Sequence, residues 1–326
     1  MATYYFNRYQ EVGEHCRGGV LTIGNFDGMH LGHQKLLQVV REHAALISAP
    51  RAVYTFNPHP SRVISPHKSS PMINGQRYKM KLLEALGIDV IINQEFTNEF
   101  SQISAHDFVV EILHKKLKLS EVVVGENYRF GREAQGDVNT LAMLLASCGM
   151  KLLVVPGVHI EGRLCSSTYI RELVQKGEMR TAAQFLGRPF SYVAQVEHGA
   201  GRGGSIGIPT VNVEAGVELI PANGVYASLV LINGRLFLGA TNVGVRPTFE
   251  KSGVKTIETH LINENGDFYG KEIEIFFIDK IRDEKRFDSV AELKNQIKAD
   301  IVVAQDIATK EKAKLLSWLS HIEISA

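Results

Sequence analysis

Two histidines, His30 and His33, stand three residues apart in a glycine-rich segment that follows a short apolar run. Gly24, Gly28 and Gly32 let the backbone approach a ligand closely. A helix that begins here would offer free N–H groups and partial positive charge to a phosphate. Its first turn would also place both imidazoles on one side. The pattern predicts imidazoles that donate hydrogen bonds to a phosphate undergoing in-line displacement. The alternatives are a plain strand–turn–helix junction and a metal pair, and the metal pair lacks a third ligand at a suitable spacing.

A second phosphate-type signal comes later, where the hydroxyls of Ser166, Ser167 and Thr168 open a predicted helix. Arg171 follows one turn further on the same face. Hydroxyls, N–H groups and a guanidinium together suit a leaving pyrophosphate, and a plain Ser/Thr N-cap is the alternative. Combined with the histidine pair, at the carboxyl ends of parallel strands, this segment favours nucleotidyl transfer.

Two more segments follow apolar runs and have the composition of site loops. In Phe56–Pro60, prolines stiffen the chain and His59 is predicted to face the nucleotide, with a rigid turn as the alternative. In Gly125–Gly131, Asn127 and Arg129 are accompanied by two aromatic residues suited to stacking on a flat ring. A solvated surface position is the alternative for Arg129.

The second half contains a glycine-rich loop, Gly199–Gly204, that matches the dinucleotide-binding pattern literally. The residues after it are β-branched and include Pro209, so no helix follows and dinucleotide binding is rejected. The loop still suits phosphates through its backbone N–H groups. Beyond it, Thr210 and Asn212 lie on one face of an extended segment. They offer weak neutral oxygens to Mg²⁺, which binds nucleotide phosphates as well.

A carboxylate suited to proton transfer, Glu258, lies in the alternating segment Thr256–Ile262. The alternation places Glu258 and His260 on the face opposite the apolar side chains. Near a Mg-nucleotide loop, a carboxylate on a rigid strand can accept the proton of an attacking alcohol. An ordinary solvent-facing glutamate is the alternative.

The elements that must position these residues change character near residues 186–190. Before that point, short apolar runs alternate with helical periodicity, which predicts an α/β domain, a parallel sheet with helices on both faces. The predicted strands are 20–23, 52–56, 89–92, 121–124 and 151–155. The predicted helices are 33–45, 78–86, one capped by Ser104, 137–147, 168–175 and 180–186.

After that point, β-branched and aromatic strands predominate, at 193–197, 225–232, 236–241, 256–262 and 272–277. Asn233-Gly234 between two of them is a strong hairpin signal, and a helical pattern runs from Ser289 to Trp318. We therefore expect two domains, 1–186 and 187–326. The second is a small antiparallel β-barrel or sandwich closed by C-terminal helices.

Composition excludes several classes of protein. The 326 residues include 36 Lys+Arg and 35 Asp+Glu, and this balance argues against a nucleic-acid coat or a polybasic membrane anchor. Three widely spaced cysteines fit neither a disulfide framework nor a zinc site, and no export signal or membrane span is visible. We expect a cytoplasmic protein without nucleic-acid or membrane partners, either monomeric or weakly self-associating.

Together these segments resemble the bacterial bifunctional riboflavin kinase/FMN adenylyltransferase family, also called prokaryotic FAD synthetase. The resemblance rests on segments 24–33, 56–60, 125–131, 166–171, 206–212, 221–226, 244–248 and 258–260. It implies a nucleotidyltransferase-type domain followed by a riboflavin-kinase barrel. It also implies two reactions with ATP: phosphorylation of riboflavin to FMN with formation of ADP, then adenylylation of FMN to FAD with release of pyrophosphate.

The resemblance also implies roles for single residues. His30, His33 and Arg171 would act in adenylyl transfer, and Glu258 would be the kinase base. Thr210 and Asn212 would bind Mg²⁺ with its nucleotide. The nucleotide contacts would come from Gly24, Phe26, Asp27, Gly28, Asn127, Ser166, Ser167, Thr168, Gly207 and Pro209. The flavin contacts, by a less specific match, would come from His59, Arg129 and Arg282.

Two other functions fit parts of the sequence. The first is a one-reaction adenylyltransferase, acting on pantetheine phosphate or nicotinate mononucleotide, with an unrelated appended domain. It would not require the Pro209–Asn212 segment or Glu258. The second is a flavin-binding protein without catalysis, against which the intact histidine pair argues. Formation of FMN from riboflavin separates both from the two-reaction hypothesis.

Overall fold

The computed structural model describes residues 2–197, 208–214, 216, 218–245, 255–264 and 266–321. Its contacts divide the chain into two compact units. The first comprises Met1–Ser70 and Gln76–Cys165, and the second Pro71–Gly75 and Ser166–Ala326. Residues 166–186 thus belong to the second unit by their contacts, and the domain limits 1–186 and 187–326 stay a prediction. Among the described residues, no helix combines the length and apolarity needed to cross a bilayer.

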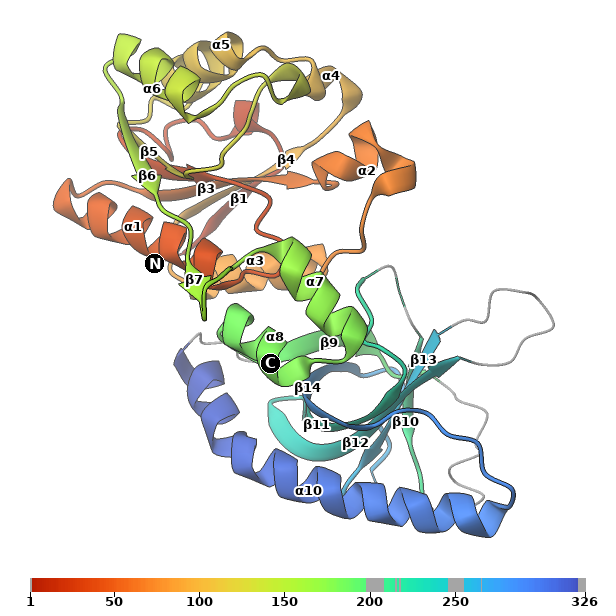
Figure 1. Cartoon of the computed structure of the whole chain (residues 1–326). Coiled ribbons are helices and arrows are strands. Elements are labelled where there is room, and N and C mark those ends of the chain that lie inside the picture. The colour runs from red at the N-terminus through yellow and green to blue at the C-terminus, as the bar shows by residue number, and fades with distance from the viewer. Residues whose placement is uncertain are drawn as a thin grey trace. The chain divides into compact units, whose positions relative to one another are not determined.

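The first unit alternates strands and helices (Figure 1). Its elements are β1 Tyr4–Phe6, η1 Tyr9–Glu11, β2 Val20–Ile23, α1 Leu31–Leu46, β3 Arg51–Asn57, α2 Pro60–Ile64, η2 Pro66–Lys68, α3 Gln76–Ala85, β4 Val90–Glu95, α4 Asn98–Ser101, α5 Ala105–Asp107, η3 Phe108–Lys116, β5 Glu121–Gly125, η4 Arg132–Ala134, α6 Val138–Ser147, β6 Lys151–Val155, β7 His159–Ile160 and β8 Arg163–Leu164.

Strands β1 to β6 form a six-stranded parallel sheet in the order β1-β4-β3-β2-β5-β6, while β7 and β8 form a separate antiparallel pair. Leu21 of β2 lies opposite Ala52 of β3 and Val122 of β5. Because the strands are parallel, the segments after β3, β2 and β5 begin at one edge of the sheet. Three of the four predicted adenylyl-transfer segments therefore leave neighbouring strands at the same edge.

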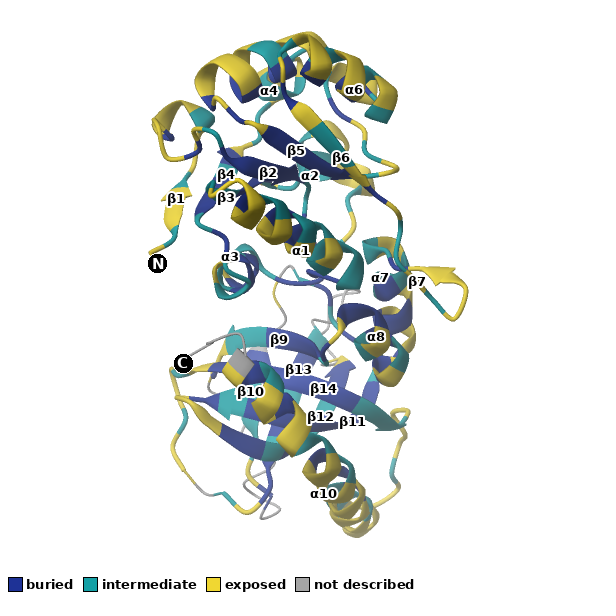
Figure 2. Ribbon diagram, turned by 90° about the vertical axis from the view of Figure 1, so that its left-hand side faces the viewer, coloured by how far each residue is buried: buried dark blue, intermediate teal, exposed yellow. Residues whose placement is uncertain are grey.

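Helices cover both faces of this sheet, as predicted. On one face, Leu21 and Tyr54 belong to a core with Phe108 of η3 and Leu141 of α6. On the other face, Val20 and its neighbours pack with residues of α1. Every residue of β2 is consequently buried, and Figure 2 shows this dark central layer between helices with exposed outer sides. Because both faces of the parallel sheet are covered by helices, the sequence of β2 is a continuous apolar run rather than an alternating one.

The second unit is mainly an antiparallel sheet. Its elements are α7 Ser167–Lys176, α8 Met179–Leu186, β9 Phe190–Gln195, β10 Val211–Glu214, β11 Gly224–Ile232, β12 Arg235–Val245, β13 Lys255–Leu261, β14 Glu272–Arg282 and α10 Val290–His321. The strand order is β10-β13-β12-β11-β14-β9. A bridge between Glu197, just past β9, and Asn212 of β10 joins the two edge strands, which agrees with the predicted barrel.

One long helix, α10, covers the second unit's sheet in place of the several C-terminal helices that the sequence predicted. Ala308, Leu315 and Leu319 pack against Leu229 of β11 and Phe276 of β14. The helical pattern is unbroken by glycine or proline from Val290 onward, so a single helix can follow the sheet surface.

Several boundaries differ from those predicted. β9 begins at Phe190 rather than residue 193, and α1 begins at Leu31 because His30 is its N-cap. Strand β1 was missed, since it is short and exposes Tyr4 and Tyr5. The Asn233-Gly234 hairpin is confirmed: Ile232 pairs with Arg235, and both turn residues have positive φ.

Candidate active sites

The loop after β2 has an unusual backbone that aims the histidines. Phe26, Gly28 and Met29 all have positive φ, at 50°, 81° and 42°. The ring of Phe26 has no exposed surface and lies edge-on to His33, with ring centroids 5.2 Å apart. Gly24 is packed against the Phe26 ring, which a Cβ would approach to 3.3 Å. The buried ring of Phe26 therefore packs against the loop and holds its backbone in place.

His30 and His33 lie together at the start of α1. Their rings are stacked with centroids 3.6 Å apart and an interplanar angle of 20°. His30 is the N-cap of α1, and its Nδ1 accepts a hydrogen bond of 3.4 Å from the backbone N–H of His33. An acceptor Nδ1 places the proton of a neutral imidazole on Nε2.

The electrostatics of the site favour a neutral His33 ring. Burial, the His30 imidazole and the Lys79 ammonium hold the pKa of His33 well below its ordinary value. A neutral imidazole still donates one N–H. Burial lowers the pKa of Lys79, and the carboxylate of Asp27, which lies in the same loop and is only 2% exposed, opposes that shift. Lys79, on α3, is a residue that the sequence analysis missed.

In the segment after β3, His59 and Pro60 form the start of helix α2. His59 caps α2, where its Nδ1 accepts a hydrogen bond of 3.2 Å from Ser61 N and lies 2.8 Å from Ser61 Oγ. Pro60 occupies the first turn of that helix, a position that tolerates proline. This agrees with the rigid-turn alternative, and a contact between His59 and flavin stays a prediction.

After β5, Asn127 and Arg129 are both exposed. The Arg129 guanidinium lies 3.9 Å from Asp137 and is 61% exposed, so this pair is weakly held. Tyr128 and Phe130 stack on each other at 5.6 Å, and Phe130 is part of the core. The roles predicted for Asn127 and Arg129 are not tested by these contacts.

In the second unit, Ser166 is the N-cap of α7, and its Oγ accepts a hydrogen bond of 3.3 Å from Tyr169 N. Ser167 and Thr168 therefore occupy the first turn, where backbone N–H groups lack helical acceptors. Arg171 donates from Nε to the carbonyl of Pro71 at 2.9 Å. It thereby holds the segment Pro71–Gly75 within this unit.

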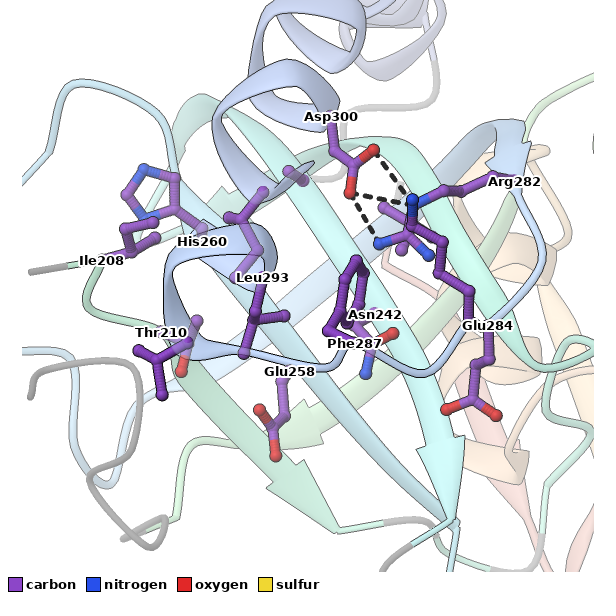
Figure 3. Close-up of a pocket in the computed structure, with 15 residues that line it drawn as sticks. Ile208, Thr210, Asn242, Glu258, His260, Arg282, Glu284, Phe287, Leu293 and Asp300 are labelled. Atoms are coloured by element: carbon purple, nitrogen blue, oxygen red, sulfur yellow. Dashed lines mark hydrogen bonds and ion pairs between the residues drawn. The ribbon is translucent and has the colours of Figure 1, made fainter. Parts of the chain in front are cut away.

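The second unit also contains a cavity of about 450 Å³. Its lining includes Ile208, Thr210, Val225, Ala240, Asn242, Glu258, His260, Arg282, Glu284, Lys285, Phe287, Val290, Leu293, Ile297 and Asp300. One wall is apolar and comes from Phe287 and the first turns of α10. Figure 3 shows Glu258 between Thr210 and Asn242, away from the Arg282–Asp300 pair. The cavity thus pairs a surface for a flat ring with polar groups.

Strand register brings the polar residues into a row. Glu258 of β13 lies directly opposite Asn212 of β10 on one side and Asn242 of β12 on the other. Opposed residues share a face of the sheet, so the three side chains are neighbours. The sequence analysis missed Asn242, because only the pairing of β12 with β13 places it beside Glu258.

The segment before β10 is fixed by side-chain bonds. His260 donates from Nδ1 to the Pro209 carbonyl at 2.8 Å, and Asn212 Nδ2 donates to the Thr210 carbonyl at 3.2 Å. Thr210 lines the cavity beside Glu258. The predicted nucleotide-binding residue Gly207, like the glycine loop before it, lies outside the described residues.

Arg282 lines the cavity, but its guanidinium is already bound. Nε and Nη2 donate to Asp300 of α10 at 2.8–3.1 Å, and Nη1 donates to the Asp283 carbonyl at 2.9 Å. Gln296 adds a hydrogen bond of 2.8 Å to Asp300. The structure thus gives Arg282 the role of joining β14 to α10, and flavin binding by Arg282 stays a prediction.

Comparisons with known proteins match both halves. A family model described as FAD synthetase matches residues 13–169, and one described as riboflavin kinase matches residues 186–308. Proteins named bifunctional riboflavin kinase/FMN adenylyltransferase are similar over most of the chain. The one from Escherichia coli strain K12 is 35% identical over 89% of this chain and 92% of its own length. The one from Pseudomonas fluorescens is 34% identical over 90% and 94%.

A solved structure is similar along nearly the whole chain. It is described as a macrolide-efflux protein from Streptococcus pneumoniae, and it has a TM-score of 0.85 and 29% sequence identity. The similarity covers 94% of this chain and 99% of that one.

Proposed function

The chain belongs to the bifunctional riboflavin kinase/FMN adenylyltransferase family, and from this premise we propose which residues carry each reaction. The protein phosphorylates riboflavin with ATP to give FMN. It then adenylylates FMN with a second ATP to give FAD and pyrophosphate. The order of the two matched models gives FAD synthesis to the N-terminal part and kinase activity to the C-terminal part.

In adenylyl transfer, a phosphate oxygen of FMN attacks the α-phosphorus of ATP, and the bond from that phosphorus to the bridging oxygen breaks. His30 and His33 donate N–H hydrogen bonds to the α-phosphate oxygens, where negative charge builds up. The observation that carries this proposal is the stacked pair at the start of α1. The α1 N-terminus binds the nucleotide phosphates, and Gly24, Phe26, Asp27 and Gly28 before it contact the nucleotide.

The leaving pyrophosphate is held by Ser166, Ser167, Thr168 and Arg171. Their support is the N-cap and first turn of α7, where backbone N–H groups and hydroxyls suit an anion. Asn127 adds a nucleotide contact, while His59 and Arg129 contact the flavin. These assignments rest on the family motifs.

In the kinase reaction, the terminal hydroxyl of riboflavin attacks the γ-phosphorus of ATP and gives up its proton to Glu258. The bond from that phosphorus to the β–γ bridging oxygen breaks, and ADP leaves. Glu258 suits a base because it projects into the cavity from a rigid central strand, between two polar neighbours. The apolar wall of Phe287 and α10 takes the flavin ring, with Arg282 at its edge. Gly207 and Pro209 contact the nucleotide.

Mg²⁺ fits the oxygen ligands at the start of β10, Thr210 just before the strand and Asn212 within it. Thr210 and Asn212 provide neutral oxygens, and the Asn212 Nδ2 is already bonded to the Thr210 carbonyl. Its Oδ1 is then the atom left for a cation. Mg²⁺ needs few protein ligands because it binds nucleotide phosphates and waters. When bound, it neutralises charge on the transferred phosphate.

The test is a time course with riboflavin, ATP and Mg²⁺, followed by chromatography of the flavins. The wild-type protein should give FMN and then FAD. His30→Ala with His33→Ala should stop FAD formation while FMN accumulates, with a loss of at least about 10²-fold. Glu258→Gln should lower riboflavin phosphorylation by about 10²–10⁴-fold yet convert supplied FMN to FAD. Loss of both reactions in either folded variant would contradict the two-site assignment.

The small-molecule ligands follow from the reactions: riboflavin, FMN, FAD, ATP, ADP and pyrophosphate. We further propose a cytoplasmic location, which the free cysteines Cys16, Cys148 and Cys165 support. The absence of nucleic-acid and membrane partners, and a monomeric or weakly associating state, stay predictions.

A further inference from the structure

Lys79 is a lysine buried in the first unit, on the side of α3 that faces the sheet. It is only 3% exposed. Its ammonium donates to the Asn25 carbonyl at 3.1 Å, to Thr55 Oγ1 at 3.0 Å and to the Phe56 carbonyl at 3.5 Å. Thr55 Oγ1 in turn donates to the Asn25 carbonyl at 3.3 Å. One ammonium thus connects the ends of β2 and β3.

Both connected segments belong to the adenylyl-transfer site. Asn25 lies in the loop that turns through Phe26 and Gly28 to His30, and Phe56 begins the segment that ends at His59 and Pro60. A lysine bonded to their main chains sets the distance between the two loops. It therefore acts on the histidines through the backbone rather than by touching the substrate.

The charge of Lys79 also acts on this site. Its titratable neighbours are Asp27, in the loop after β2, and His33, on α1. Strand β3 contributes the Thr55 hydroxyl and the Phe56 carbonyl, neither of which titrates. Burial lowers the pKa of Lys79 to about 8, although Asp27 opposes the shift. The ammonium in turn helps to keep His33 neutral.

Burying an ammonium in the core costs free energy, because the charged group loses its hydration. An apolar side chain would fill the same space without this desolvation penalty, so packing alone does not account for a lysine here. The hydrogen bonds and the charge are what a lysine adds, and both are directed at the histidine loop.

We propose that Lys79 is a positioning residue for adenylyl transfer, whose buried ammonium ties the 24–30 loop to the Phe56–Pro60 segment and so fixes the His30–His33 pair against the α-phosphate. The inference rests on the proposed role of the two histidines.

The experiment compares Lys79→Met with Lys81→Met, a control two residues along the same helix. Adenylylation of supplied FMN is measured from pH 6.5 to 9.5, and FMN formation from riboflavin is measured on the same samples. At neutral pH, Lys79→Met should lower kcat for adenylylation by at least about tenfold, because small displacements of catalytic groups are costly. FMN formation and the Lys81→Met variant should stay within about twofold of wild type.

The pH profile separates this role from simple support of the fold. Above about pH 8, Lys79 loses its proton, so wild-type adenylylation should decline there and kinase activity should not decline with it. Lys79→Arg, which keeps a charge that does not titrate, should remove that decline. This variant also decides the matter if Lys79→Met does not fold.

Two results would overturn the inference: adenylylation by a folded Lys79→Met within about twofold of wild type, or an unchanged basic limb in Lys79→Arg. A wild-type protein that did not convert FMN to FAD would instead overturn the proposed function.

Discussion

At the scale of single residues, the histidine pair depends on a neighbour that has no side chain. Gly32 lies between His30 and His33, where an added Cβ would be 3.0 Å from His30 Cε1 and 3.1 Å from His30 Nδ1. The His30 ring cannot simply retreat, because it is stacked on His33 at 3.6 Å. The glycine in the His-x-Gly-His pattern therefore makes room for the capping imidazole.

We predict that Gly32→Ala lowers kcat for adenylylation by about tenfold or more, since the imidazole must move by a few tenths of an ångström. Riboflavin phosphorylation by the same protein should be unchanged. The unfolding free energy should not fall by much, because alanine is a better helix former than glycine by about 1 kcal/mol. Initial rates with FMN and with riboflavin, together with urea unfolding, check this. Normal adenylylation would show that the ring tolerates the methyl group.

At the scale of elements, the cavity of the second unit depends on how α10 is attached to β14. The side chain of Asp300 on α10 is only 5% exposed. It accepts hydrogen bonds from Arg282, whose side chain is 20% exposed. The same helix carries a matched exposed pair, Asp306 with Lys310, whose side chains are 63% and 69% exposed. The two aspartates allow buried and exposed ion pairs to be compared on one helix.

Asp300→Ala should destabilise the second unit by about 3–5 kcal/mol, because it leaves a largely buried guanidinium without its carboxylate. Asp306→Ala should change stability by no more than about 0.5 kcal/mol, as is typical of surface positions. Trp318 of α10 is the single tryptophan of the chain, so its fluorescence during urea unfolding reports on this unit. Equal effects of the two substitutions would mean that Arg282 does not depend on Asp300.

The sequence predicted elements better than it predicted individual contacts. The run Val20–Ile23 followed by His30 and His33 was correctly interpreted as strand, loop and helix, because both signals are local. Asn233-Gly234 was correct for the same reason. Lys79 and Asn242 were missed, because their neighbours come from other segments of the chain. The Lys79 ammonium on α3 bonds to the Asn25 carbonyl after β2, and the pairing of β12 with β13 places Asn242 beside Glu258.

At the scale of the whole molecule, the chain consists of two units with separate cores. The histidine pair lies in the first unit, while Glu258 and its cavity lie in the second. Neither the imidazoles nor the carboxylate belongs to the other unit's sheet. FMN is the product of the reaction that we propose for Glu258 and the substrate of the reaction that we propose for the histidine pair.

This separation predicts that two defective proteins can cooperate. Glu258→Gln alone should make little FMN from riboflavin, and His30→Ala with His33→Ala should stop at FMN. Mixed with riboflavin, ATP and Mg²⁺, they should produce FAD after a lag, because FMN from the second protein diffuses to the intact adenylylation site of the first. Chromatography of the mixture over time checks this, with FMN added to Glu258→Gln alone as the positive control. If the control produced FAD while the mixture accumulated FMN without FAD, FMN would have to be handed over within one chain.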